Sequence, residues 1–286
     1  MAEAFGHKFG QIIGDALECS IAPCLKVFAR KNHLFLDSNG PRPARKGNKV
    51  SWTDINGNKH DLDYVMERGG TTTKTGAPVA FIECAWRRYT KHSRNKAQEI
   101  QGAIIPLFEK YKKEHPFIGV VLAGEFTQGS LSQLESLGFC ILHFPYQSII
   151  KSFAVVGIDA QFDEHTGEKH FERQVRKWET LSTPQKRKVY KQIAKIGRSD
   201  LNRFISSLTK SIKRRITKIR VWTIYGEKHE FNSIAQVKTF LSTFQPQPAS
   251  SQFDRFEAEI EYSNGDVIKA AHKDKNEFLV FLSYFI

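Results

Sequence analysis

The chain alternates between segments with apolar residues at helical spacing and short apolar runs that are typical of strands. Apolar residues recur with a period near 3.6 over residues 3–30, which predicts a helix that Pro23 divides. Further helices are predicted at 93–113 and 131–137, and Asn56-Gly57-Asn58 predicts a hairpin turn. Strands are predicted at 34–36, 50–52, 62–66, 79–86, 117–126 and 140–144. This order predicts a mixed β-sheet flanked by helices, in the α/β (α+β) class.

The C-terminal part contains an internal repeat with a period of about 41 residues. Each unit is predicted to be a hairpin followed by a helix. The first has its turn at Gly226 and its helix ends at 239–244, and the second has its turn at Asn264-Gly265 and its helix ends at 280–285. The linker 245–251 joins them. Because neither unit buries its apolar face alone, the two together predict a small α+β domain.

The excess of positive charge lies in one segment. The chain carries 43 Lys and Arg against 30 Asp and Glu, a net charge of +13. Between Lys169 and Arg220, 17 basic residues stand against three acids, and the rest of the chain is nearly neutral. Apolar residues at helical spacing from Val189 to Leu208 predict folded helices here. Basic side chains one helical turn apart repel each other, and a bound polyanion relieves this repulsion. We therefore expect nucleic acid phosphates as the partner. A basic surface without a partner and an anionic membrane surface are the alternatives.

Composition narrows the class of protein. Hydrophobic residues make up 40% of the chain and charged residues 26%, which is typical of globular proteins. No apolar run approaches the roughly 18 residues of a membrane span, and we expect no secretory signal at the N-terminus. The four cysteines form no CxxC pair, which predicts buried, reduced thiols in a cytoplasmic protein. The composition therefore argues against the membrane, secreted and disordered classes.

Acidic residues occur where strands are predicted to be buried. Asp61 and Asp63 enter one predicted strand, and Glu83 is the one acid in the apolar run 79–86. A buried carboxylate needs a partner or a metal ion. Acids at this spacing on adjacent strands form a site for a hard cation, with open positions for water and phosphate, and Glu18 on the first helix supplies a third carboxylate. Salt bridges to nearby arginines are the alternative for each acid.

This order of elements and acids resembles the αβββαβ core of the PD-(D/E)XK nuclease superfamily over residues 1–155, and in particular the type II restriction endonucleases. The resemblance implies that Asp63 and Glu83 bind a catalytic Mg²⁺, for which Mn²⁺ is a substitute. It also implies that Glu18 corresponds to the acid that some members carry on their N-terminal helix. The reaction implied is the hydrolysis of a phosphodiester bond by a metal-activated water.

Two positions depart from the pattern of that superfamily. Leu62 stands before Asp63 in place of Pro, which is a common departure, and Ala85 occupies the position of the expected Lys. Some members take the lysine from the following helix. There Lys96 lies roughly 60° from the centre of the buried face and is preferred over Lys91. If neither lysine reaches the site, we expect an inactive relative that only binds DNA.

Basic residues that follow the Glu83 strand and open the next helix form a pattern suited to phosphate. The DNA-binding residues expected here are Arg87, Arg88, Lys91 and Arg94. Those expected in the basic segment are Lys186, Arg187, Lys188, Lys213, Arg214 and Arg215. The alternative is that the arginines pair with Asp61, Glu67 or Glu99 and hold the fold together.

The sequence therefore predicts a Mg²⁺-dependent endonuclease that cuts double-stranded DNA, of the restriction type. The nuclease domain is expected at 1–155, a basic helical DNA-binding segment at 156–215, and the repeated domain at 216–286, for recognition or dimerisation. A homodimer is the simplest arrangement for cutting both strands, and a cognate DNA methyltransferase would protect the host. The alternatives are a structure-specific or repair nuclease of the same superfamily, a non-catalytic DNA-binding protein, and an RNA-binding protein.

Overall fold

A computed structural model describes residues 4–223, 227–245 and 255–285. The chain divides into two compact units, residues 1–208 and residues 209–286. The boundary between the units falls inside helix α7 (Arg198–Ile212). The predicted turn at Gly226 and positions 246–251 of the predicted linker lie outside the described residues.

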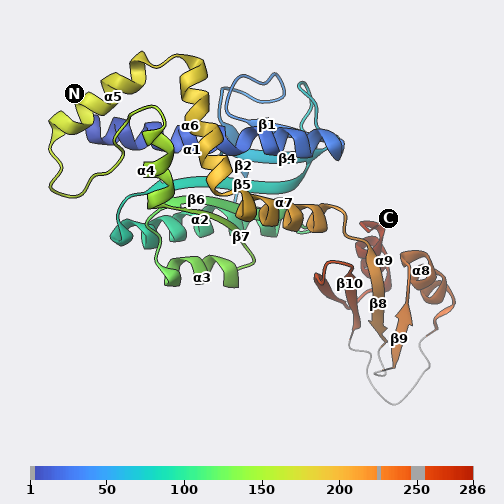
Figure 1. The fold of residues 1–286 in the computed structure, drawn as a ribbon. Coiled ribbons are helices and arrows are strands. Elements are labelled where there is room, and N and C mark those ends of the chain that lie inside the picture. Colours follow the sequence, from blue (N-terminus) through green and yellow to red (C-terminus); the bar gives the residue numbers. More distant parts are fainter. Residues whose placement is uncertain (1–3, 224–226, 246–254, 286) are drawn as a thin grey trace. The chain divides into compact units, whose positions relative to one another are not determined.

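A five-stranded mixed sheet forms the centre of the first unit (Figure 1). Its strands, in spatial order, are β1 (Leu34–Ser38), β4 (Tyr64–Arg68), β5 (Ala77–Arg87), β6 (Phe117–Gly124) and β7 (Cys140–Pro145). The pairs β1–β4 and β4–β5 are antiparallel, whereas β5–β6 and β6–β7 are parallel. Every residue of β6 is buried, as expected for a strand that is covered on both faces. The predicted fold class, a mixed sheet flanked by helices, is confirmed.

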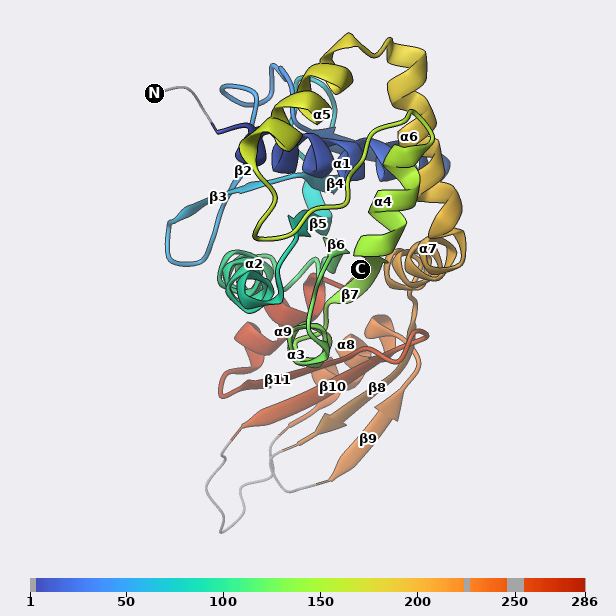
Figure 2. The same cartoon turned by 60° about the vertical axis from the view of Figure 1, so that its left-hand side comes forward.

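Helices cover both faces of this sheet (Figures 1 and 2). One side carries α1 (Phe5–Lys31), α4 (Tyr146–Ala154), α5 (Glu168–Thr180) and α6 (Thr183–Ile196). The other side carries α2 (Thr90–Lys110) and α3 (Gln128–Ser136). Helices α5 and α6 both pack against α1, and the ring of Phe9 in α1 meets those of Phe153 and Phe171. Helices α5 and α6 are therefore part of the first unit.

The prediction that Pro23 divides the first helix is wrong, because α1 runs through it. A proline inside a helix removes one backbone hydrogen bond, at a cost of about 3 kcal/mol. Leu17 and Ile21 before Pro23 and Leu25 and Phe28 after it are all buried. Burial of such side chains stabilises the helix by roughly 1.5–3 kcal/mol each, which outweighs the lost bond.

A hairpin precedes Asp63 and changes the predicted strand 62–66. It consists of β2 (Val50–Thr53) and β3 (Lys59–Leu62), and its predicted turn is confirmed, with Gly57 at φ +88°. Leu62 ends β3 and Tyr64 begins β4, so that Asp63 lies between two strands and does not enter one with Asp61. Asp63 therefore lies where the chain leaves the β2–β3 hairpin and enters the five-stranded sheet.

The second unit is built from the predicted repeat, which is confirmed. The first copy contains β8 (Ile216–Trp222), β9 (Lys228–Phe231) and α8 (Ile234–Thr243), and the second contains β10 (Phe256–Tyr262), β11 (Val267–His272) and α9 (Lys275–Ser283). Their strands form one antiparallel sheet in the order β11-β10-β8-β9. Ile219 pairs with Ile260, its equivalent 41 positions later, and the flanking pairs are symmetric about them. The two copies are thus related by a local two-fold arrangement.

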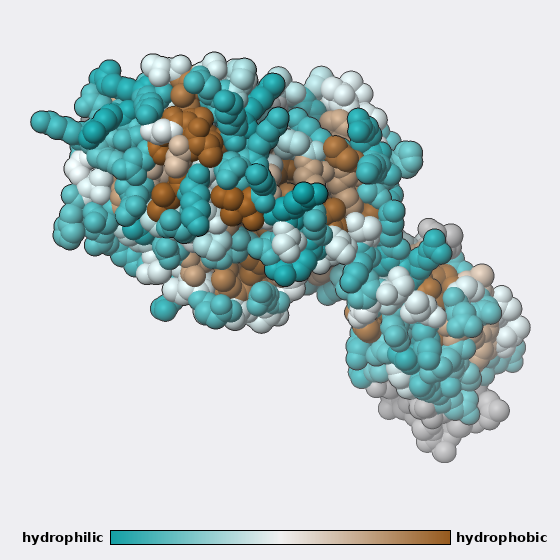
Figure 3. Space-filling view, viewed as in Figure 1, coloured by the Kyte–Doolittle hydropathy of each residue, from teal (hydrophilic) through white to brown (hydrophobic). Residues whose placement is uncertain are grey.

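The surface of each unit is largely hydrophilic, and the cysteines differ in their exposure. Figure 3 shows hydrophilic side chains over most of the visible face of each unit, with small separate hydrophobic patches. None of the helices in the described ranges combines the length and the apolar character that crossing a membrane requires. The four cysteines are free thiols, as predicted, but the prediction that they are buried is wrong for Cys19, which is exposed, and holds only in part for the other three, which are half-buried.

Candidate functional site

Asp63 and Glu83 are brought together by the pairing of β4 with β5. Tyr64 lies opposite Ile82 in that antiparallel register, so Asp63, one residue earlier, lies level with Glu83. The backbone N–H of Cys84 donates a hydrogen bond of 2.6 Å to Oδ2 of Asp63. This bond ties the carboxylate of one strand to the backbone of the next, beside the second acid.

Lys96 approaches the same point from helix α2. Its Nζ lies 4.0 Å from Oε1 of Glu83 and 3.4 Å from Oε2 of Glu99. Ala97 and Ile100, on the buried face of α2, hold the helix against the sheet. The side chains of Lys96 and Glu83 are only 19% and 17% exposed, so their charges interact through a poorly solvated space. The structure places the preferred lysine beside Glu83.

The second candidate lysine is placed elsewhere. Nζ of Lys91 donates a 2.8 Å hydrogen bond to Oε1 of Glu164, and both side chains are exposed. Glu164 belongs to the segment between α4 and α5, 73 residues further along the chain. Lys91 therefore forms a surface ion pair, and Lys96 is the lysine that accompanies Glu83.

Glu18 lies on α1 and interacts with the site through its charge, but it does not join Asp63 and Glu83 as the predicted third metal ligand among the described residues. The hydroxyl of Tyr64 donates a 3.1 Å hydrogen bond to the backbone carbonyl of Glu18, which anchors this turn of the helix to β4. Burial raises the pKa of the Glu18 carboxyl to about 8, with further contributions from the negative charges of Asp63 and Asp15. Glu18 is thus in electrostatic contact with the Asp63 carboxylate.

The acids of this site resist ionisation. Burial and then the charge of Asp63 raise the pKa of Glu83 to about 8, although Lys96 acts in the opposite direction. Burial also raises the pKa of Asp63, against the hydrogen bond from Cys84 and the charge of Lys96. Oε2 of Glu83 is buried and has no hydrogen-bond partner among the described residues. An unpaired buried carboxylate oxygen beside two other acids fits a bound cation, which would relieve both the desolvation and the repulsion.

The protein itself does not supply a complete set of ligands. Within the described ranges, no group of three or more His, Cys, Asp or Glu side chains is arranged to hold a metal ion. Asp63 and Glu83 therefore form a pair with open positions around it. Mg²⁺ sites commonly use one or two carboxylates and keep several waters or substrate phosphate oxygens, and such a pair suits that chemistry.

Sequence reasoning missed several neighbours of the acids. Burial and the nearby carboxylates keep the pKa of the Cys84 thiol well above its usual value, so it stays neutral. Asp15 lies one turn before Glu18 on α1, and this spacing was available in the sequence. Tyr190 of α6 forms a hydrogen bond with Cys19, next to Glu18, and burial raises its pKa to about 12. Nothing local in the sequence connects Tyr190 with α1.

The predicted phosphate clamp after β5 is partly engaged in holding the fold. Nη2 of Arg87 lies 3.7 Å from Glu99, which is one of the pairs considered from the sequence. Nε of Arg88 donates a 2.7 Å hydrogen bond to the carbonyl of Phe162. Arg94 is exposed on α2. The other two acids considered as partners bind different cations, Asp61 with Lys49 and Glu67 with Arg42.

The predicted basic residues of the second half fall in both units. Lys186, Arg187 and Lys188 lie on α6, where the Lys186 ammonium is 5.5 Å from the ring centre of Trp178. Arg187 and Lys188 are exposed. Because α6 packs on α1, these cations belong to the same unit as the acids.

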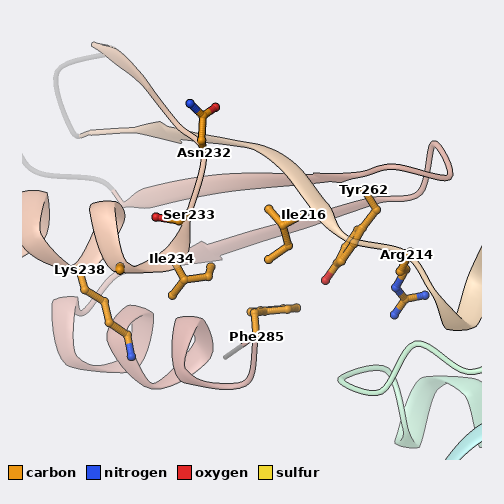
Figure 4. Close-up of a pocket in the computed structure, with 9 residues that line it drawn as sticks. Arg214, Ile216, Asn232, Ser233, Ile234, Lys238, Tyr262 and Phe285 are labelled. Carbon is orange, nitrogen blue, oxygen red and sulfur yellow. The ribbon is translucent and has the colours of Figure 1, made fainter.

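Lys213, Arg214 and Arg215 lie in the second unit. Lys213 and Arg215 are exposed, whereas Arg214 lies 3.3 Å from Asp266 and over the ring of Tyr262. Arg214 also lines a cavity of about 480 Å³ in that unit, whose wall is mostly apolar (Figure 4). Figure 4 shows Tyr262, Ile216 and Phe285 around this space.

Comparisons with known proteins leave the family open. No protein-family model matches the chain, and no curated protein matches it. A solved structure titled "Crystal Structure of Protein of Unknown Function AF1548" covers 69% of this chain and 97% of its own, with 11% identity and a TM-score of 0.31. A likeness of this size carries no argument about fold or function.

Proposed function

We propose that the protein is a divalent-cation-dependent endonuclease that hydrolyses phosphodiester bonds in double-stranded DNA. The observation that carries the proposal is the convergence of Asp63, Glu83 and Lys96 from three different elements. Asp63, just before β4, lies level with Glu83 of β5, and the ammonium of Lys96 is 4.0 Å from Oε1 of Glu83. The pKa values of both acids are raised by burial, and carboxyl groups with perturbed pKa values that lie together are characteristic of functional sites.

The residues fit Mg²⁺, or Mn²⁺ in its place, with Asp63 and Glu83 as ligands. When bound, the cation supplies Lewis acidity to the phosphate and lowers the pKa of a water. Glu18 adds negative charge from α1 and strengthens the attraction for a cation. The hydrogen bond from Cys84 holds Asp63 in position, so that little conformational freedom is lost on binding.

Lys96 has a separate role. Its Nζ, 4.0 Å from Oε1 of Glu83, donates hydrogen bonds to the phosphate oxygens, on which negative charge builds up during attack. In a poorly solvated site such a donor is worth more than it would be in water. Lys96 thus takes the place of the lysine that is missing at Ala85.

The basic helix α6 supports DNA as the substrate. Lys186, Arg187 and Lys188 belong to the same unit as the acids, and the helix that carries them is packed on α1. Cations on a helix of the same unit are suited to a phosphate backbone, because they attract the polymer while the acids need a cation at the scissile bond. Restriction-type specificity, a homodimer and a cognate DNA methyltransferase stay predictions.

The test is incubation of unmodified plasmid and phage DNA with the full chain in Mg²⁺ and in EDTA. We expect cleavage only in Mg²⁺, and none by the Glu83→Gln variant. Glu164→Gln, which alters an exposed acid on the far loop, is the matched control and should cleave like the original protein. Discrete fragments would indicate a sequence-specific enzyme. Cleavage confined to branched DNA would indicate a structure-specific or repair nuclease, and DNA that is bound but intact would overturn the proposal in favour of a non-catalytic binding protein.

A further inference from the structure

A polar cavity of about 460 Å³ lies in the first unit, beyond the candidate acids. The side chains that matter for its chemistry are Arg88, Tyr146, Asp159, Phe162, Asp163 and His170. Arg88 directly follows β5, and Tyr146 begins α4 directly after β7. The cavity is therefore at the carboxyl ends of the parallel strands. Open α/β sheets commonly bind ligands in this position.

The wall of the cavity is held rigidly. The Tyr146 hydroxyl donates a 2.8 Å hydrogen bond to the carbonyl of Ala160 and accepts one of 2.8 Å from the N–H of Phe162. The Arg88 guanidinium lies 4.0 Å from the centre of the Tyr146 ring, and its Nε is bound to the Phe162 carbonyl. Aromatic rings and a planar guanidinium fixed in this way form a preorganised surface for a flat ligand.

The polar groups of the cavity include one buried nitrogen that has no hydrogen-bond partner among the described residues. Nε2 of His170 is buried and has no partner among the described residues. Hydrogen bonds from Thr166 and from the N–H of His165 lower the pKa of Asp163, so that this carboxylate stays charged. Oδ1 of Asp159 accepts a hydrogen bond from the N–H of Gln161. An unsatisfied buried nitrogen in a polar cavity is costly unless something binds it.

The charge balance indicates which kind of ligand fits. Arg88 contributes one positive charge to the lining, and Asp159 and Asp163 contribute two negative charges. A free phosphate would be repelled by the two carboxylates. A neutral, flat ligand that offers N–H groups to the carboxylates and acceptors to Arg88 and His170 satisfies both sets of groups. Amino-bearing nucleobases have this pattern, whereas thymine has no amino group.

We propose that this cavity takes an amino-bearing nucleobase that is turned out of the DNA substrate. The proposal rests on the proposed function, since it uses DNA as the ligand. Arg88 lies five residues after Glu83, roughly 17 Å along an extended strand, which is about five steps of a DNA strand. A base extruded about five nucleotides from the cleavage point is therefore within reach, at a cost of a few kcal/mol for unstacking.

The first arm of the experiment measures DNA binding to the full chain with Glu83→Gln, which binds but does not cut. Two duplexes are compared that differ only in one unpaired base, a bulged cytosine or a bulged thymine. We expect about tenfold tighter binding of the cytosine bulge, because a good base contact is worth about 1–3 kcal/mol. The added variants Asp159→Asn and His170→Phe should each remove the preference. Asp200→Asn, an exposed aspartate on α7 that pairs with Arg203, is the matched control and should retain it.

The second arm tests whether the cavity binds a base within DNA or a free nucleoside. Deoxycytidine and deoxyguanosine are titrated into the same protein by calorimetry. Weak binding of the nucleosides together with the bulge preference supports the proposal. Nucleoside binding without a bulge preference would overturn it in favour of a free nucleoside as ligand, and equal binding of both bulges with no nucleoside binding would overturn it altogether. If the bulge preference is found but the unaltered protein never cuts DNA, the nuclease proposal is wrong and the inference about the cavity is retained.

Discussion

The backbone N–H of Cys84 and the carboxylate of Asp63 are joined by a 2.6 Å hydrogen bond across β4 and β5. This bond is formed where β4 begins, so Asp63 is fixed although it lies between strands. Glu83 precedes Cys84 and is thereby held beside Asp63. Two acids that repel each other are thus kept together by the sheet, which is expected only where a cation or a proton relieves the repulsion.

Substitution of Lys96 should reduce DNA cleavage far more than substitution of Lys91. Lys96→Ala removes the ammonium next to Glu83, and we expect the single-turnover rate to fall by about 10²–10³-fold, as for the loss of one transition-state donor. Lys91→Ala removes an exposed pair with Glu164 and should leave the rate within about threefold. Equal losses in the two variants would mean that Lys96 has no special role.

Metal-free protein should lose stability as the pH rises from 6 to 9. The pKa values of Glu18 and Glu83 are about 8 in the folded chain against an ordinary value of 4.5. The folded state therefore holds protons that the unfolded chain has released, and their stabilising effect is lost as the pH rises through 8. We expect the midpoint of thermal unfolding in EDTA to fall over this range.

Two variants and added Mg²⁺ serve as controls for the predicted fall of the unfolding midpoint with pH. Glu83→Gln cannot ionise and should show a shallower fall, whereas Glu164→Gln should behave like the original chain. Mg²⁺ should also reduce the fall, because a cation favours the ionised acids. A midpoint that is independent of pH, or one that rises toward pH 9, would contradict the raised pKa values.

The sequence was sufficient to predict the acids and one lysine but not their surroundings. Glu83 stands out because it is the one acid in an apolar run, and helical geometry at 100° per residue favoured Lys96. Lys91 was a weaker candidate for the same role, and only the fold shows that Glu164, 73 residues away, pairs with it. Tyr190 could not be predicted, since its contact with α1 depends on how α6 packs.

Arg42 should be essential for the stability of the first unit. Its guanidinium binds Asp37 at 2.8 Å and Glu67 at 2.6 Å, and only 4% of its side chain is exposed. Arg42→Met leaves the buried Glu67 carboxylate without its cation and leaves Asp37 with Arg45 alone, and we expect a loss of about 3–5 kcal/mol in the free energy of unfolding, measured with urea. Lys49→Met breaks the exposed pair with Asp61 and should have little effect. Comparable losses would show that the buried pair contributes nothing special.

The cations of α6 should set the salt dependence of DNA binding. In the triple alanine variant of Lys186, Arg187 and Lys188, the slope of log affinity against log salt should become shallower by about 0.9 for each DNA phosphate that the variant no longer neutralises. Lys110→Ala with Lys112→Ala is the control, because Lys110 ends α2 about 21 Å from Lys96. An unchanged slope in the triple variant would place the DNA on another surface.

Binding of Mn²⁺ to the metal-free full chain, followed by electron paramagnetic resonance, tests the central claim most directly. If Asp63 and Glu83 bind the cation, Mn²⁺ binding to the unaltered chain should be saturable, and Mg²⁺ should displace the bound Mn²⁺. Asp63→Asn and Glu83→Gln should each weaken that binding by at least about tenfold, while Glu164→Gln should not change it. Mn²⁺ binding that is absent, or that is equally strong in all four proteins, would contradict a metal centre at these two acids.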